Sequence, residues 1–177
     1  MTRDPHDDEK PLRELPIVVR RTSADDWVAV RTLRLEALSD SPDAFGSTYD
    51  AAAGFSDAQW RAMAQERCTF VAWDADVAVG MVGGGLNDEY PGTHWLYGMY
   101  VVPTARGTGV AAALVGAVAT WARDEGAGEL FLHVTESLAR PRAFYRKMGF
   151  EATGEERQMH REPSLTLLTL SRRLRDD

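Results

Sequence analysis

The segment 99–111, with the sequence MYVVPTARGTGVA, constrains the fold of this 177-residue chain more than any other. An apolar run typical of a β-strand ends at Pro103, a turn with Arg106, Gly107 and Gly109 follows, and a helix of small residues begins at Gly109. The first N–H groups of a helix lack helical partners, and the helix dipole adds positive charge there. Because glycine lets the backbone approach a phosphate closely, the segment predicts an anion site. An ordinary strand-turn-helix connection is the alternative.

The spacing Arg106-x-x-Gly109-x-Ala111 differs from two common nucleotide-binding patterns. No Lys-Ser/Thr pair follows the second glycine, as a P-loop requires, and no third glycine stands at the dinucleotide-binding spacing. The pattern resembles the pyrophosphate-binding motif Arg/Gln-x-x-Gly-x-Gly/Ala of the GNAT-type N-acetyltransferases. A second segment, 143–150 with the sequence AFYRKMGF, resembles the other common motif of that family. The resemblance extends over about residues 17–174.

The resemblance implies that acetyl-CoA binds along this strand and turn. Backbone N–H groups at the turn would hold the pyrophosphate, and the main chain of the strand would pair with the pantetheine arm and supply an oxyanion donor. The residues expected to contact coenzyme A are Met99, Tyr100, Val101, Arg106, Gly107, Thr108, Gly109, Val110 and Ala111.

Tyr145 is the residue to which the resemblance assigns catalysis. The family's tyrosine lies near the thioester sulfur, where it can protonate the leaving thiolate. A phenol is suited to this role because it is protonated at neutral pH. A tyrosine that only packs on the sheet is the alternative.

The resemblance assigns no general base. Trp95 stands where many family members carry a glutamate, and strand alternation points the neighbouring His94 to the other face. Asp50, Asp88 and Glu89 are candidates on flanking loops. A water relay, or an acceptor amine that is already neutral, would need no carboxylate.

Four other residues are notable for their type or position. Leu138 stands where the family often has asparagine, and Pro141 falls in the first turns of the same predicted helix, so we expect an altered helix entry. His133 is interpreted as a partnered core or surface histidine. Cys68, the one cysteine, is interpreted as a core thiol rather than a nucleophile, and a disulfide within the chain is excluded.

The resemblance implies an acceptor pocket between the first two helices and the open side of the fourth strand. An aromatic wall there could hold a cation by cation–π attraction, although packing in the core is the alternative for each ring. The aromatic residues placed to line it are Phe45, Tyr49, Trp95 and Tyr97.

Composition narrows the class of partner and the location. A net charge of −7 argues against non-specific binding to nucleic acid. The charged N-terminus has no apolar signal-peptide region, and the longest low-charge run, 109–122, is too short for a membrane span. We therefore expect a cytoplasmic protein with no membrane partner. No metal-ligand spacing occurs in the sequence, so we expect no metal.

Hydrophobic patterns predict the element order β-α-α-β-β-β-α-β-α-β-β. This order indicates a GNAT-like α/β fold, a mixed and mostly antiparallel sheet flanked by helices, with residues 1–16 as a flexible tail and 17–174 as one domain.

We therefore expect an N-acetyltransferase that moves an acetyl group from acetyl-CoA to a primary amine by direct attack in a ternary complex. The acceptor is a small-molecule or protein amine. An enzyme that uses another acyl-CoA, or a coenzyme A-binding sensor without turnover, is the alternative. The sequence does not determine the oligomeric state, and a homodimer is one of the possibilities.

Overall fold

The computed structural model describes residues 16–174, so the tail predicted over 1–16 lies outside the described residues except for Pro16. The strands are β1 Val18–Arg21, β2 Cys68–Asp74, β3 Val77–Asn87, β4 Tyr90–Val101, β5 Glu129–Thr135, β6 Glu151–Met159 and β7 Glu162–Arg173. The helices are α1 Trp27–Asp40, α2 Tyr49–Ala53, α3 Asp57–Glu66, α4 Val110–Asp124 and α5 Ala139–Lys147. Short 3₁₀ turns lie at Ala24–Asp26, Pro42–Ala44 and Pro103–Ala105.

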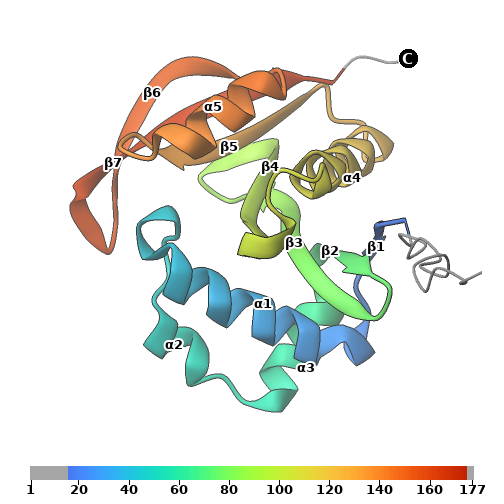
Figure 1. Cartoon of the computed structure of the whole chain (residues 1–177). Coiled ribbons are helices and arrows are strands. Elements are labelled where there is room, and N and C mark those ends of the chain that lie inside the picture. The colour runs from blue at the N-terminus through green and yellow to red at the C-terminus, as the bar shows by residue number, and fades with distance from the viewer. Residues whose placement is uncertain (1–15, 175–177) are drawn as a thin grey trace, which may run out of the picture.

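The described strands form one sheet of seven, in the order β1-β2-β3-β4-β5-β7-β6. Helices α1, α2 and α3 cover one side, and α4 and α5 cover the other (Figure 1). The mixed α/β fold and the order of its elements confirm the prediction, with the short helix α2 as an addition. Pro141 is the third residue of α5, near the helix start, where proline is tolerated.

The sheet opens in its middle, between β4 and β5. These are its one parallel pair, and their register has only two residue pairs, His94 with Leu130 and Trp95 with Phe131. Beyond Trp95 the two strands separate. The main chain of β4 after that point therefore has no strand beside it on the β5 side.

A β-bulge bends β4 just after the strands separate. Met81 pairs with Tyr100 and Gly83 pairs with Tyr97, so β4 holds one residue more than β3 over this interval. Gly98 lies in the bulge with φ of +64°, a left-handed conformation that glycine adopts without strain. The bulge and the residues of β4 that follow it line the cavity at this opening.

The glycine run 83–85 lies inside β3 and permits close packing of rings. A Cβ on Gly84 would come within 2.7 Å of the Trp121 ring on α4, and a Cβ on Gly83 within 2.6 Å of the Tyr97 ring. These distances are too short for real Cβ contacts. The glycines therefore allow the rings of Tyr97 and Trp121 to pack directly against the strand, and the run is not a phosphate loop.

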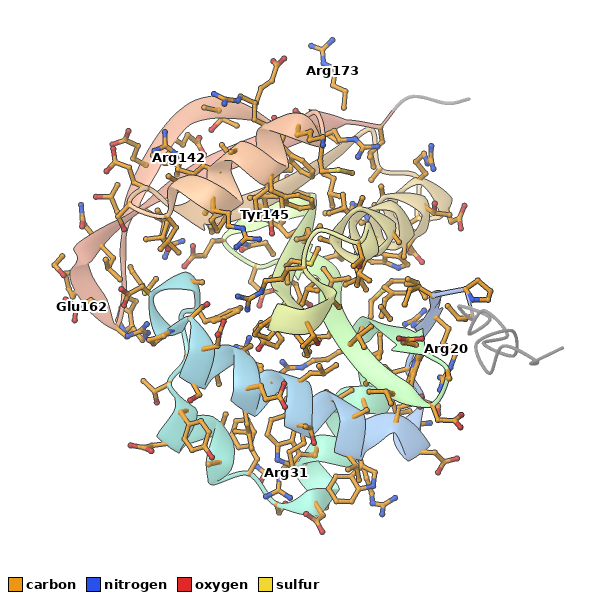
Figure 2. All side chains as sticks on the ribbon, in the orientation of Figure 1. Arg20, Arg31, Arg142, Tyr145, Glu162 and Arg173 are labelled. Carbon is orange, nitrogen blue, oxygen red and sulfur yellow. The ribbon has the colours of Figure 1, made fainter. Side chains whose placement is uncertain are left out.

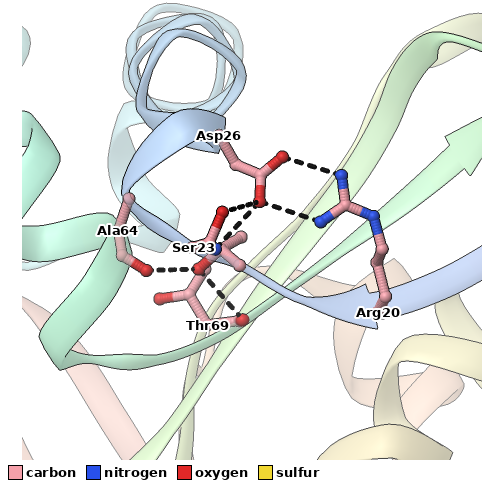
Figure 3. A network of polar contacts seen from close by, with 6 residues as sticks. Arg20, Ser23, Asp26, Ala64 and Thr69 are labelled. Atoms are coloured by element: carbon pink, nitrogen blue, oxygen red, sulfur yellow. Dashed lines mark hydrogen bonds and ion pairs between the residues drawn. The ribbon is translucent and has the colours of Figure 1, made fainter.

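A polar network fixes the start of α1 against β1 (Figure 3). The Arg20 guanidinium donates to both oxygens of Asp26, at 2.8 and 2.7 Å. Asp26 also accepts the Ser23 N–H at 2.8 Å, as in a capping box. The Thr22 hydroxyl donates to the Ala64 carbonyl at 2.7 Å, which joins the same corner to α3.

The segment 87–93 is polar in sequence but is mostly strand. β3 continues to Asn87 and β4 begins at Tyr90, so only Asp88 and Glu89 form the turn. The Tyr90 ring lies 5.2 Å from that of Trp95, and this ring contact extends the hairpin beyond what residue polarity suggests.

Candidate active site

The opening between β4 and β5 is a cavity of about 690 Å³. Five separate segments of the chain contribute its walls: the loop after α1, the end of β4, the turn before α4, the end of β5 and the helix α5. Of the predicted site residues, the lining includes Phe45, Tyr97, Met99, Tyr100, Val101, Arg106, Gly107, Gly109, Ala111 and Tyr145. Thr108, Val110, Trp95 and Tyr49 lie outside it.

The turn before α4 lines this cavity through Gly107 and Gly109. Gly107 and Gly109 have φ of +83° and +92°, and an added Cβ at either would meet no atom within 4 Å. Glycine is therefore needed there for its conformation and not for space. The first bond of α4 runs from the Ala113 N–H to the Gly109 carbonyl, so the N–H groups before Ala113 have no helical partner. This arrangement suits a phosphate group.

Arg106 is held by two other elements. Its Nη2 lies 2.6 Å from Oδ2 of Asp40, at the end of α1, and its Nε donates to the Val101 carbonyl at 3.0 Å. The guanidinium lowers the pKa of the Asp40 carboxyl by this hydrogen bond. The positive charge of Arg106, which the sequence analysis places at the phosphate site, is therefore already paired with the Asp40 carboxylate.

Tyr145 lies on α5 and is one of the residues that line the cavity (Figure 2). Its ring makes edge contacts with Phe144 and Phe150, at centroid distances of 5.2 and 5.7 Å, and the residue is only 7% exposed. Burial raises the pKa of the phenol above its ordinary value, because the phenolate would lose its hydration. Tyr145 is therefore a protonated donor at neutral pH.

Two of the four aromatic residues expected at the acceptor pocket line the cavity. Phe45 is buried in its wall, and Tyr97 is half-exposed with its hydroxyl bonded to the Gly84 carbonyl at 2.9 Å. Trp95 is only 4% exposed because its ring stacks on Phe131. Tyr49 is exposed on α2, away from the lining.

His133 also lines the cavity, a position that the sequence interpretation did not assign to it. Its Nδ1 lies 3.3 Å from the Thr169 hydroxyl, but its buried Nε2 has no hydrogen-bond partner among residues 16–174. Burial lowers the pKa of this imidazole to about 4, so it is neutral at pH 7. Strand alternation could have revealed its placement: Leu132 and Val134 are buried in the core beneath α4 and α5, so His133 faces the opposite side.

The other titratable candidates lie outside the lining. Asp50, Asp88 and Glu89 are not among the cavity residues, and Glu89 is ion-paired with Arg157. Cys68 is buried on β2, also outside the lining, and burial raises the pKa of its thiol. The predicted interpretation of Cys68 as a core thiol agrees with this placement.

A second, more open groove of about 1060 Å³ runs along α1 and the β2–β3 hairpin. It contains neither Tyr145 nor the glycines of the turn before α4, so it is not the site described above. Among residues 16–174, no cluster of His, Cys, Asp or Glu could hold a metal ion, and no helix is long and apolar enough to cross a membrane.

Comparison with known proteins agrees with this geometry. Residues 29–150 match the model of the acetyltransferase (GNAT) family. An aminoglycoside N(6')-acetyltransferase type 1 of Salmonella typhimurium is 26% identical over 141 residues, which cover 76% of this chain and 90% of the relative.

Two solved structures share the fold. One is yncA of Salmonella typhimurium, solved with its cofactor acetyl-CoA, with a TM-score of 0.75, 16% identity, and coverage of 92% of this chain and 96% of that one. A GCN5-related N-acetyltransferase from Kribbella flavida has a TM-score of 0.70 and 24% identity, with coverage of 89% and 98%. From the family match over most of its length and from its fold, this chain belongs to the GNAT acetyltransferase family.

Proposed function

We propose that this protein transfers an acetyl group from acetyl-CoA to a primary amine. One observation carries the proposal: the phosphate-type turn, the unpaired edge of β4 and the buried phenol of Tyr145 all line one cavity. These are the three groups that acyl transfer from a thioester requires, namely a cofactor cradle, an oxyanion donor and a proton source. The family membership of the chain supports the same reaction class.

The N–H groups of the turn from Gly107 to Ala111 would hold the pyrophosphate, with Arg106 beside it. The main chain of Met99, Tyr100 and Val101, on the unpaired edge of β4, would pair with the amide groups of the pantetheine arm. The acetyl-CoA bound in yncA, which has the same fold, supports this choice of donor.

The reaction is a direct attack. The neutral amine nitrogen bonds to the thioester carbon, and a β4 N–H stabilises the oxyanion that forms. The nitrogen of this tetrahedral intermediate loses its proton to solvent, the C–S bond breaks to leave the acetylated amide, the departing thiolate takes the Tyr145 proton, and the phenolate regains a proton from solvent. Trp95 stands where many family members carry a glutamate that could act as the base. We therefore propose that the amine reaches the cavity already neutral or loses its proton through water.

An acceptor screen tests the proposal. Thiol release from acetyl-CoA is followed with small amines, free amino acids, aminoglycosides, polyamines and peptides, and product masses are recorded. We expect amine-dependent thiol release that gives one acetylated product per thiol. Parallel reactions with propionyl-CoA and succinyl-CoA test the alternative acyl donors. If acetyl-CoA raises the melting temperature but none of the amines tested is acetylated, the result would indicate the sensor function instead.

A further inference from the structure

The side of α5 that lines the cavity carries two cations. Arg140 and Lys147 both line the cavity, as does Phe144 between them, and the three residues fall at positions i, i+4 and i+7 of the helix. Such positions lie on one side of a helix, and the two cations are about 10 Å apart along its axis. The sequence of α5, ARPRAFYRK, holds no acidic residue that could neutralise them within the helix.

Neither cation has a polar partner within residues 16–174. No ion pair or side-chain hydrogen bond joins Arg140 or Lys147 to another described residue. Arg106, the other arginine of the cavity lining, is in contrast paired with Asp40 at 2.6 Å. The positive charge that is free to meet an anion in this cavity therefore lies on α5 and not at the turn before α4.

Acetyl-CoA carries one more phosphate than the turn before α4 would hold. The N–H groups of that turn suit the diphosphate. The adenosine of the coenzyme also carries a 3′-phosphate, a monoester with a charge of roughly −1.5 to −2 at pH 7. A chain with a net charge of −7 repels such a group unless cations are gathered where it binds. Arg140 and Lys147 are the unpaired cations that the cavity lining supplies.

We propose that Arg140 and Lys147 bind the 3′-phosphate of coenzyme A, so that α5 selects coenzyme A over analogues that lack this phosphate. This inference rests on the proposed binding of acetyl-CoA in this cavity. An arginine donates two parallel hydrogen bonds to a phosphate, and a lysine adds a compact charge. Both side chains are long and exposed, so they can reach one phosphate from the two ends of α5. The 3′-phosphate is remote from the thioester, so it contributes to binding and not to the transfer step.

Titration calorimetry with coenzyme A and dephospho-coenzyme A tests this assignment, because the two ligands differ only in the 3′-phosphate. At low salt we expect the native protein to bind coenzyme A at least about tenfold more tightly, the scale of a charge-assisted hydrogen bond. This preference should shrink at high salt, because exposed charges are screened. The double variant Arg140→Met with Lys147→Met should reduce the ratio of the two Kd values to near one, and Lys147→Arg should retain most of it.

The double variant Arg142→Met with Arg146→Met is the matched control. Both arginines are exposed on the same helix but lie outside the cavity lining, and the change in net charge is the same (Arg142 is labelled in Figure 2). The control should keep the full preference for coenzyme A. An equal loss of preference in both double variants would show only a general effect of charge and overturns the inference.

Two other results overturn it as well. Equal affinity of the native protein for the two ligands would show that the 3′-phosphate is not bound. If Arg140→Met with Lys147→Met weakens both ligands by the same factor, the two cations act on the diphosphate and not on the 3′-phosphate. The melting temperature of each variant without ligand verifies that it is folded.

Kinetics with acetyl-CoA and acetyl-dephospho-CoA separate this inference from the proposed function. Loss of the 3′-phosphate should raise KM by about the factor found in calorimetry and leave kcat unchanged, because it removes binding that is equal in the ground state and the transition state. If Arg140 and Lys147 give the preference in calorimetry but no amine is acetylated, the proposed function fails and the assignment of α5 stands. If amines are acetylated with the same KM for both donors, the assignment of α5 fails and the proposed function stands.

Discussion

Arg106 and Asp40, which are 66 residues apart in the chain, form an ion pair with 2.6 Å between Nη2 and Oδ2. The pair joins the turn before α4 to the last residue of α1. It also places a carboxylate beside the groups proposed to bind a diphosphate. In our proposal the same arginine therefore stabilises the fold through Asp40 and also contacts the coenzyme.

Replacing Asp40 by asparagine should strengthen binding of coenzyme A. The change removes a negative charge near the diphosphate and releases the Arg106 guanidinium. Titration calorimetry at low salt should show a decrease in Kd of roughly threefold to tenfold, which shrinks at high salt because exposed charges are screened. Asp57→Asn, on α3, is the control. Weaker binding by Asp40→Asn would show that the ion pair is needed to shape the turn.

Gly109 and Gly116 offer a matched pair at the start and in the interior of α4. Gly109 has φ of +92° and Gly116 does not have a positive φ, while an added Cβ at either position meets no atom within 4 Å. Gly109→Ala should therefore lower the free energy of unfolding by about 1 kcal/mol and weaken coenzyme A binding, because it moves the N–H groups. Gly116→Ala should raise stability by roughly 0.5–1 kcal/mol and leave binding intact. Urea unfolding measures the stability of each variant, and calorimetry measures its binding of coenzyme A. Equal changes in stability and binding for the two variants would contradict this account.

The local parts of the site could be predicted from the sequence. A strand, a glycine turn and a helix of small residues are adjacent in the chain, and the left-handed glycines 107 and 109 follow from local chemistry. Pairings between distant segments could not be predicted. The ion pair of Arg106 with Asp40, and the insertion of β7 between β5 and β6, depend on tertiary packing.

The side chains of the acceptor wall show the same limit. Alternation along a strand places Trp95 and Tyr97 on one face, but it does not show that Trp95 is covered by Phe131 and His133 while Tyr97 reaches the cavity. The β-bulge at Gly98, which also lines the cavity, is not indicated by the sequence pattern either.

The Arg20–Asp26 pair predicts a loss of stability in acid. The hydrogen bond from Arg20 lowers the pKa of Asp26 from 3.8 to about 2, and the pKa is lower in the folded state. The stabilisation is therefore complete above about pH 4 and is lost as the pH falls toward 2. Asp26→Asn should cost about 1 kcal/mol at pH 7, a modest value because Arg20 is half-exposed.

Urea unfolding of native protein and Asp26→Asn at several pH values between 7 and 2.5 measures this effect. The difference in the free energy of unfolding should narrow as the pH falls below 4. Asp57→Asn, at an exposed helix start, is the control: its difference in the free energy of unfolding from the native protein should not narrow in the way expected for Asp26→Asn. A constant difference across the range would show that Asp26 acts through shape and not through charge.

Tyr145→Phe should lower kcat by roughly 10²-fold, the usual scale for a positioned general acid. The KM for acetyl-CoA should barely change, because the hydroxyl matters mainly in the transition state. Since burial raises the pKa of Tyr145, the native rate should rise with pH as the acceptor amine loses its proton, with no decline from ionisation of the phenol up to about pH 10. Phe144→Leu, which keeps the hydroxyl, is the control, and full kcat in Tyr145→Phe would show that the ring only packs.

The most direct test of acetyl transfer in a ternary complex is a rapid-quench single turnover followed by intact mass measurement. Protein in excess over acetyl-CoA is mixed with and without the best acceptor, and thiol, acetylated amine and protein mass are recorded together. We predict one acetylated amine per thiol, no thiol release without amine and no acetyl group on the protein at any time, with Cys68→Ser behaving as the native protein. An acetylated protein that forms without amine and decays at the rate of turnover, and that disappears in Cys68→Ser, would contradict the account.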